Sequence, residues 1–197
     1  MPLHDRILEH FTASAQAKLA VADALAPDIE RAARLIVHCL TQGNKILACG
    51  NGGSAAHAQR FVSLMINRFE QERPGLAALT LAADSSTLTS IANEHAFDQV
   101  FARQVKALGQ PGDILLAISA SGHSPSVLQA ALTAHARHVH VIALTGHRGG
   151  ELAEQMSDDD VLLCVPVEST ARIQEIHLLV IHCLCDAVDS VLLGVEE

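Results

Sequence analysis

Residues 45–54 of the chain, KILACGNGGS, decide how it folds. The segment starts as a short apolar run, passes into a turn with three glycines, and ends at a serine that precedes a helix-forming stretch. A buried strand followed by a glycine-rich turn and a helix is typical of parallel α/β sheets. We therefore expect a strand at residues 45–49 and a helix at residues 54–69.

The same alternation continues to the end of the chain. Apolar runs predict further strands at residues 76–81, 113–118, 140–144 and 161–165, and helical patterns predict helices at residues 85–93, 97–108, 125–137, 149–156 and 170–192. Strands that alternate with helices require right-handed crossovers and a parallel sheet. The strands are apolar throughout, as expected where helices cover both faces. The sequence thus predicts a three-layer α/β domain.

The first 43 residues carry no strand pattern. Apolar residues recur at helical spacing through residues 4–22, and Pro27 suits the first turn of a second helix that ends at Gly43. We predict a helical hairpin over residues 1–43 and an α/β core over residues 44–197, both within a single domain.

Composition limits the classes of function. The 197 residues are 49% apolar, carry a formal net charge of −9 and include only 3% aromatic residues. Negative charge repels nucleic acids and anionic membranes, and few rings are available to stack on bases. We therefore expect no direct nucleic-acid partner and no membrane partner.

The chain shows no targeting or redox signal. No uninterrupted apolar run is long enough to span a membrane, and the first residues lack the order of a signal peptide. The five cysteines lie in apolar stretches without metal-binding spacing. This pattern predicts reduced core thiols in a cytoplasmic protein.

Two strand-to-helix junctions predict an anion site. The loop CGNGGS, residues 49–54, lets backbone N–H groups approach an anion, and SASGHS, residues 119–124, adds three hydroxyls at another helix start. Ser124 alone also suits an ordinary N-cap, which leaves Ser119 and Ser121 unexplained. Because parallel strands end at one sheet edge, the two loops together predict a site for a phosphorylated small molecule.

Several motifs together resemble one family. CGNGGS, AISASGHS at residues 117–124 and ARIQEIH at residues 171–177 are similar, in order and spacing, to motifs of the sugar isomerase (SIS) family, and INRFEQERP at residues 66–74 also fits. Within that family the chain most resembles the phosphoheptose isomerases and their non-enzymatic, DiaA-like relatives. The resemblance implies a flavodoxin-like SIS fold with a five-stranded parallel sheet, a homotetramer, and sugar-phosphate sites near subunit interfaces.

The resemblance also assigns ligand contacts. It implies substrate-binding positions at Asn51, Gly52, Gly53, Ser54, Asn93, Glu94, Ser119, Ala120, Ser121, Ser124 and Gln174. Ala120 replaces the usual threonine of the family, and Glu94 replaces the usual aspartate.

A larger departure from the enzymes lies on the helix after CGNGGS. Aldose–ketose isomerisation needs acid–base groups and often a metal. The isomerases place a zinc-binding His and a zinc-binding Glu, taken as the base, one turn apart on this helix; these positions are Arg60 and Leu64 here. A guanidinium cannot ligate a cation, and leucine cannot accept a proton.

The other half of the enzymes' site is present. Gln174 and His182 are eight residues apart on one stripe of the last helix, but two neutral ligands are too few for a usual zinc site. His182 is the catalytic candidate if the protein is active, and otherwise a packed histidine. His57, one turn before Arg60, is a possible substitute ligand, and His177 could line the same cleft without an assigned role.

Two functions remain open. We expect a phosphosugar-binding tetramer without a cofactor that regulates replication initiation in the DiaA manner, through the initiator protein as partner. The alternative is a sedoheptulose 7-phosphate isomerase with a rewired, zinc-using site. A transcription factor is disfavoured because no basic patch or DNA-binding domain accompanies the predicted fold.

Overall fold

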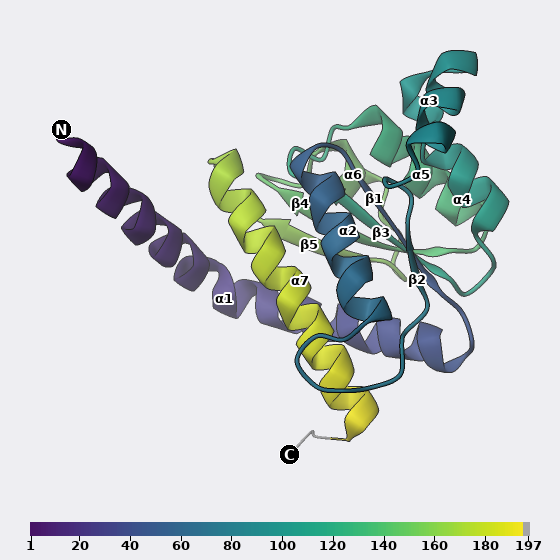
Figure 1. The fold of residues 1–197 in the computed structure, drawn as a ribbon, viewed down its shortest axis with the longest axis horizontal. Helices are drawn as coiled ribbons and strands as arrows, with labels where there is room; N and C mark the ends of the chain where they lie inside the picture. The colour runs from purple at the N-terminus through teal and green to yellow at the C-terminus, as the bar shows by residue number, and fades with distance from the viewer. Residues whose placement is uncertain (195–197) are drawn as a thin grey trace.

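The computed structural model describes residues 1–194 and contains one parallel sheet (Figure 1). Its strand order is β2-β1-β3-β4-β5. The strands are β1 (Ile46–Gly50), β2 (Ala78–Thr80), β3 (Ile114–Ser119), β4 (His140–Gly146) and β5 (Val161–Val165). The predicted five-stranded parallel sheet is therefore confirmed.

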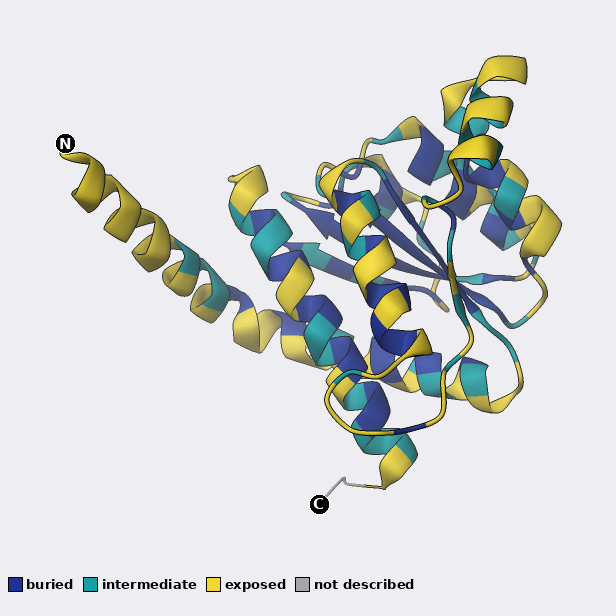
Figure 2. Ribbon diagram, in the orientation of Figure 1, coloured by how far each residue is buried: buried dark blue, intermediate teal, exposed yellow. Residues whose placement is uncertain are grey.

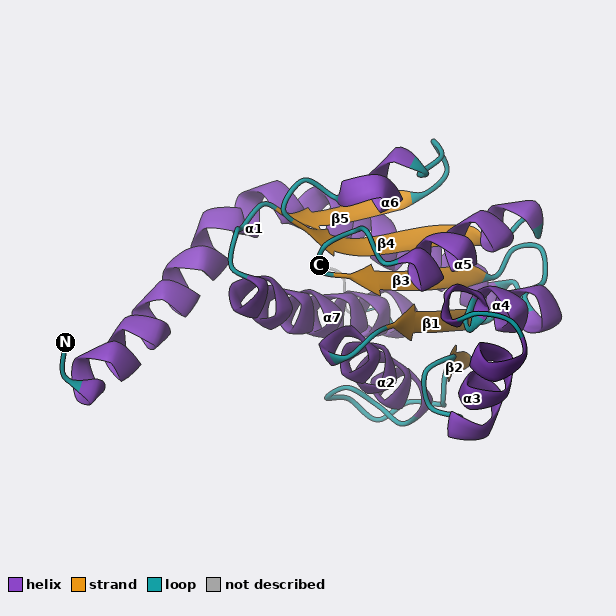
Figure 3. Cartoon of the chain, turned by 90° about the horizontal axis from the view of Figure 1, so that it is seen from above, coloured by secondary structure: helices purple, strands orange, loops and turns teal. Residues whose placement is uncertain are grey.

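Helices cover both faces of the sheet, as Figure 3 shows from above. One face carries α1 (Leu3–Thr41), α2 (Gly53–Ile66) and α7 (Thr170–Leu193); the other carries α3 (Ser85–Glu94), the 3-10 turn η1 (Phe97–Gln99), α4 (Ala102–Leu108), α5 (Pro125–Ala136) and α6 (Gly150–Glu154). Successive strand residues enter opposite cores: Ile46 packs under α1, α2 and α7, whereas Leu47 packs under α4 and α5. This alternation confirms the three predicted layers.

The predicted hairpin over residues 1–43 is wrong, because α1 is one helix of 39 residues that runs through Pro27. Proline lacks an N–H, so the carbonyl of Asp23 loses its helical donor. The helix continues because its buried stripe is unbroken: Leu25 before the proline and Ala32 after it face the same core. The predicted helix at residues 97–108 is also divided, into η1 and α4.

The amino-terminal half of α1 projects from the body of the protein (Figure 2). Ser14 donates a hydrogen bond to Glu175 at 2.6 Å, and Arg172 donates one to the His10 carbonyl at 2.7 Å. The projecting half exposes large apolar side chains, namely Leu3, Ile7, Leu8, Phe11 and Leu19. Such a surface is expected to be buried by another chain.

α7 combines high hydropathy with a packed position. By length and composition alone it could cross a membrane, with a mean hydropathy of 1.8 over its most apolar window. Glu175, Asp186 and Asp189 interrupt the apolar run, and the face from Ile173 to Val188 packs in the core shared with α1 and α2. In this fold α7 is a core helix.

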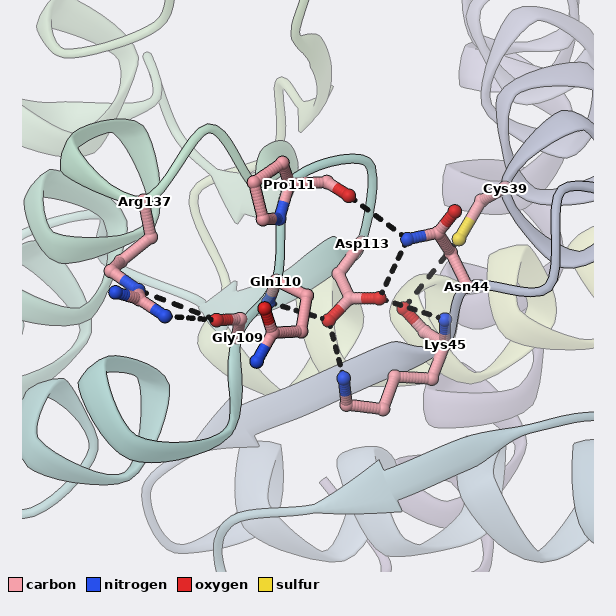
Figure 4. A network of polar contacts seen from close by, with 8 residues as sticks. All are labelled: Cys39, Asn44, Lys45, Gly109, Gln110, Pro111, Asp113 and Arg137. Carbon is pink, nitrogen blue, oxygen red and sulfur yellow. Dashed lines mark hydrogen bonds and ion pairs between the residues drawn. The ribbon is translucent and has the colours of Figure 1, made fainter.

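Asp113 organises the edge of the sheet where β1 and β3 begin (Figure 4). Its carboxylate accepts hydrogen bonds from Lys45 Nζ at 2.6 Å, the Lys45 N–H at 3.0 Å and the Gln110 N–H at 2.8 Å. Burial is the largest influence and raises the pKa of Asp113, but these donors together with Asn44 outweigh it and lower the pKa. The network joins two strand entries and has a structural role.

Candidate functional site

The two predicted anion loops meet at the carboxyl edge of the sheet. The loop after β1 leads into α2, the loop after β3 leads into α5, and a pocket of about 260 Å³ lies between them and the start of α7. It is lined by Asn51, Ser54, Ile118, Ser119, Ala120, Ser121, Ser124, Thr170 and Gln174. Larger hollows of about 470 and 510 Å³ lie along the projecting half of α1, and neither is lined by a residue of the two loops.

The pocket suits an anion although no lysine or arginine lines it. Three helices, α2, α5 and α7, begin at its walls, so the partial positive charges of their amino-terminal ends lie at the site. Serine and threonine hydroxyls add further donors. Neutral donors of this kind bind phosphate well at helix starts.

Asn51 ties the two loops together. Its Nδ2 donates to the hydroxyl of Ser124 at 2.8 Å and to that of Ser126 at 2.9 Å. Within the second loop, the Gly122 N–H donates to the Ser119 hydroxyl at 3.2 Å. These contacts hold the hydroxyls in place before a ligand arrives.

Gly53 brings the last helix close to the first loop. A Cβ at this position would lie 2.7 Å from Nε2 of Gln174, which is closer than real Cβ contacts allow. Glycine therefore permits the Gln174 amide to lie against the start of α2 and to form part of the pocket wall.

Most residues assigned by the resemblance gather here. Asn51, Ser54, Ser119, Ala120, Ser121, Ser124 and Gln174 line the pocket, and Gly52 and Gly53 form the turn into α2. Asn93 and Glu94 do not line it, because they lie exposed at the end of α3. Thr170 also lines the pocket and was not predicted from the sequence. Its position one turn before Gln174 on the same helix could have indicated that it faces the pocket.

The positions assigned to zinc and base do not form a metal site. Arg60 is exposed, and Leu64 is buried in the core beneath α2. His182 lies against Phe69, with ring centroids 5.5 Å apart, and its buried Nε2 has no hydrogen-bond partner. Among residues 1–194 no three His, Cys, Asp or Glu side chains gather to hold a metal ion. The donors that residues 1–194 place at these positions therefore do not fit zinc.

Two histidines lie behind the pocket walls. His57 is one helical turn after Ser54, His177 is one turn after Gln174, and the two ring centroids are 6.3 Å apart. His177 is fully buried, and its Nε2 lies 2.9 Å from the Thr145 carbonyl oxygen. Burial lowers the pKa of His57, and burial lowers the pKa of His177 to about 4. Both rings are therefore neutral at pH 7.

Comparison with known proteins identifies relatives over the whole chain. The SIS domain family matches residues 10–146. Proteins named phosphoheptose isomerase from Thiobacillus denitrificans and Azoarcus sp. are 76% and 58% identical over 197 residues, which is 100% of both chains in each case. The solved phosphoheptose isomerase of Neisseria gonorrhoeae has a TM-score of 0.92 at 49% identity, and the match covers 96% of this chain and 100% of that chain.

These relatives correct the expectation of a non-catalytic, DiaA-like regulator of replication initiation. That expectation rested on Arg60 and Leu64, and it is wrong because the relatives that match the whole chain are named as isomerases. The initiator protein is therefore unsupported as a partner. By its whole-length identity and its fold, the chain belongs to the SIS domain family and, within it, to the phosphoheptose isomerases.

Proposed function

We propose that this protein is an enzyme that interconverts sedoheptulose 7-phosphate and an aldoheptose 7-phosphate. The names of relatives with 76% and 58% identity support this class of reaction. The observation that carries the proposal is the pocket at the carboxyl edge of the sheet, where hydroxyls and three helix starts converge. Such a pocket suits the phosphate on C7 of the sugar.

The pocket residues divide into binding and positioning roles. The phosphate is expected to accept hydrogen bonds from the hydroxyls of Ser119, Ser121 and Ser124 and from the Ser126 N–H in the first turn of α5, where Pro125 has no N–H. Asn51 keeps the two loops in register through its bonds to Ser124 and Ser126. The Gln174 amide, on the opposite wall, can bind a sugar hydroxyl.

The reaction moves hydrogen within the sugar and needs no oxidant. When the C1–H bond breaks, its electron pair forms the C1=C2 bond of an enediol and the carbonyl oxygen on C2 takes a proton. Protonation of C2 and loss of the O1–H proton then give the aldehyde. The protein must supply a proton acceptor and donor and hold the open-chain sugar in place.

We further propose that the enzyme is a homotetramer that works in the cytoplasm. The exposed apolar side chains on the projecting half of α1 support self-association. The five cysteines form no disulfide among residues 1–194, which suits a reducing compartment. Light scattering of the purified protein should give the mass of four chains, and the mass of one chain would contradict the tetramer.

Sugar chemistry observed by NMR tests the activity. The purified protein is incubated with sedoheptulose 7-phosphate in D2O, with and without added zinc, beside a heat-unfolded sample as control. We expect aldoheptose signals and deuterium at carbon only with the folded protein. Absence of both signals from a folded sample under either condition would refute the proposed function.

A further inference from the structure

The phosphate pocket itself contains no group that can take a proton from carbon. Its walls offer hydroxyls, amides and apolar side chains, and position 64 on α2 holds a leucine. In a heptulose 7-phosphate the phosphate and the reacting carbons lie at opposite ends of the carbon chain. The acid–base group must therefore lie beyond the pocket walls rather than among the phosphate contacts.

Three polar atoms behind the walls are buried without a hydrogen-bond partner: Nδ1 of His57, Nδ1 of His177 and Oγ1 of Thr145. Each lies next to a wall residue. His57 follows Ser54 and His177 follows Gln174 by three residues, a rise of about 4.5 Å along each helix, and Thr145 pairs with Ser119 across β3 and β4. Buried polar groups without partners are rare in folded proteins, so this cluster requires an explanation.

The hydrogen bond of His177 determines its tautomer. A carbonyl oxygen only accepts, so Nε2 of the neutral ring carries the proton that it donates to Thr145, and Nδ1 presents a lone pair. The ring of His57 is its neighbour, in an edge-to-face arrangement at 68°. If Nδ1–H of His57 turns to this lone pair, Nε2 of His57 becomes a free base. In the absence of a ligand, hydrogen bonds between catalytic groups often have long donor–acceptor distances. The separation of 6.3 Å between the ring centroids of His57 and His177 fits that state.

We propose that His57 carries the proton between C1 and C2 of the sugar and that His177 is its positioning residue. This inference rests on the proposed function. Nε2 of His57 takes the proton as the C1–H bond breaks and returns it to C2, while the O1–H proton passes to O2, so the imidazole ends the cycle neutral. His57 is partly exposed, whereas His177 is fully buried, as these two roles require.

Kinetics of His57→Gln test the proton-transfer role, with His138→Asn as matched control. His138 is exposed beside the opposite edge of the sheet, and its positive φ of 56° suits asparagine. We expect kcat of His57→Gln to fall by about 100-fold or more, with KM and the Kd of inorganic phosphate unchanged. We also expect added imidazole to restore part of the activity of His57→Ala.

The outcomes separate the two claims. If the wild-type protein does not isomerise the sugar, the proposed function fails and this inference fails with it. If the wild type is active and His57→Gln keeps its kcat, only the role of His57 is overturned.

The positioning role of His177 has a readout that does not depend on turnover. Nitrogen-15 imidazole shifts report which ring nitrogen of His57 carries the proton. In His177→Phe, which keeps a buried ring but has no lone pair, we expect the His57 tautomer population to change and kcat to fall with KM unchanged. An unchanged His57 spectrum in a folded variant would overturn the pairing.

Discussion

Replacing Gly122 with alanine is expected to destabilise the protein and to disrupt the phosphate loop. Gly122 has a φ of +70°, and a Cβ there would lie 1.8 Å from the carbonyl oxygen of Gly149, against a limit of about 3.0 Å for real contacts. The loop after β3, which holds Gly122, and the loop after β4, which holds Gly149, must therefore separate by roughly 1.2 Å, the difference between these distances. That movement breaks the hydrogen bond of 2.9 Å from the Leu152 N–H to the Gly122 carbonyl.

The cost of Gly122→Ala has two parts. A left-handed conformation costs alanine about 1–2 kcal/mol, and a buried carbonyl that loses its partner costs about 1–3 kcal/mol. We expect the free energy of unfolding to fall by roughly 2–5 kcal/mol, the sum of the two parts. Gly43→Ala is the matched control, because Gly43 has a φ of +80° with nothing within 4 Å of an added Cβ. It should lose only about 1–2 kcal/mol, the conformational part.

Urea unfolding followed by circular dichroism, at one protein concentration, measures both variants. Calorimetry with inorganic phosphate then measures the binding of whichever variant folds, and we expect binding to be lost only in Gly122→Ala. If Gly122→Ala costs no more than Gly43→Ala, the close approach of the two loops does not stabilise the fold and the reasoning is refuted.

Three further predictions concern charge. Ser121→Asp places a carboxylate in the phosphate pocket and should weaken phosphosugar binding at least about 10-fold by calorimetry, since like charges repel; unchanged affinity would exclude this loop from the site. The pKa of Asp113 is lowered in the fold, so its stabilising effect is complete above its unfolded pKa and is lost as the pH falls below about 4. In Asp113→Asn, the free energy of unfolding measured with urea should therefore decrease less between about pH 5 and acidic pH than in the wild type. The same decrease in both proteins would show that Asp113 does not cause it. Arg73→Met leaves the buried Asp189 carboxylate unpaired and should lower the free energy of unfolding by about 3–5 kcal/mol. Arg73→Met with Asp189→Leu should restore only the part due to the unpaired charge, because the hydrogen bonds of Arg73 to the Leu64 and Met65 carbonyls stay lost.

Local sequence patterns predicted the helices and strands, because the formation of a helix or strand depends mainly on residues that are close together in the chain. The apolar runs at residues 113–118 and 161–165 lie within one residue of β3 and β5, since a strand covered on both faces must be apolar along its length. At Pro27 the local pattern gave a wrong prediction, a new helix start. Its local signal marks a helix start, but the core contacts of Leu25 and Ala32 hold α1 together across it.

The candidate site could be predicted only in part from the sequence. Gly50, Asn51 and the serines of the second loop are recognisable because strand-to-helix junctions of one parallel sheet end at the same edge. The sequence also shows that position 64 carries no base and position 60 no metal ligand. It cannot show that Asn93 lies outside the pocket, because α3 is placed by packing against other elements.

The sequence by itself determined the parallel α/β fold, the anion loops and the chemical identity of each side chain, because these follow from local order and spacing. Only the tertiary structure decided that Gln174 packs on Gly53, that His57 and His177 face each other behind the pocket, and that their Nδ1 atoms remain unpartnered. Each of these contacts joins α2 to α7, which lie more than a hundred residues apart in the chain. Contacts over such separations are set by how whole helices pack on the sheet, and no local pattern encodes them.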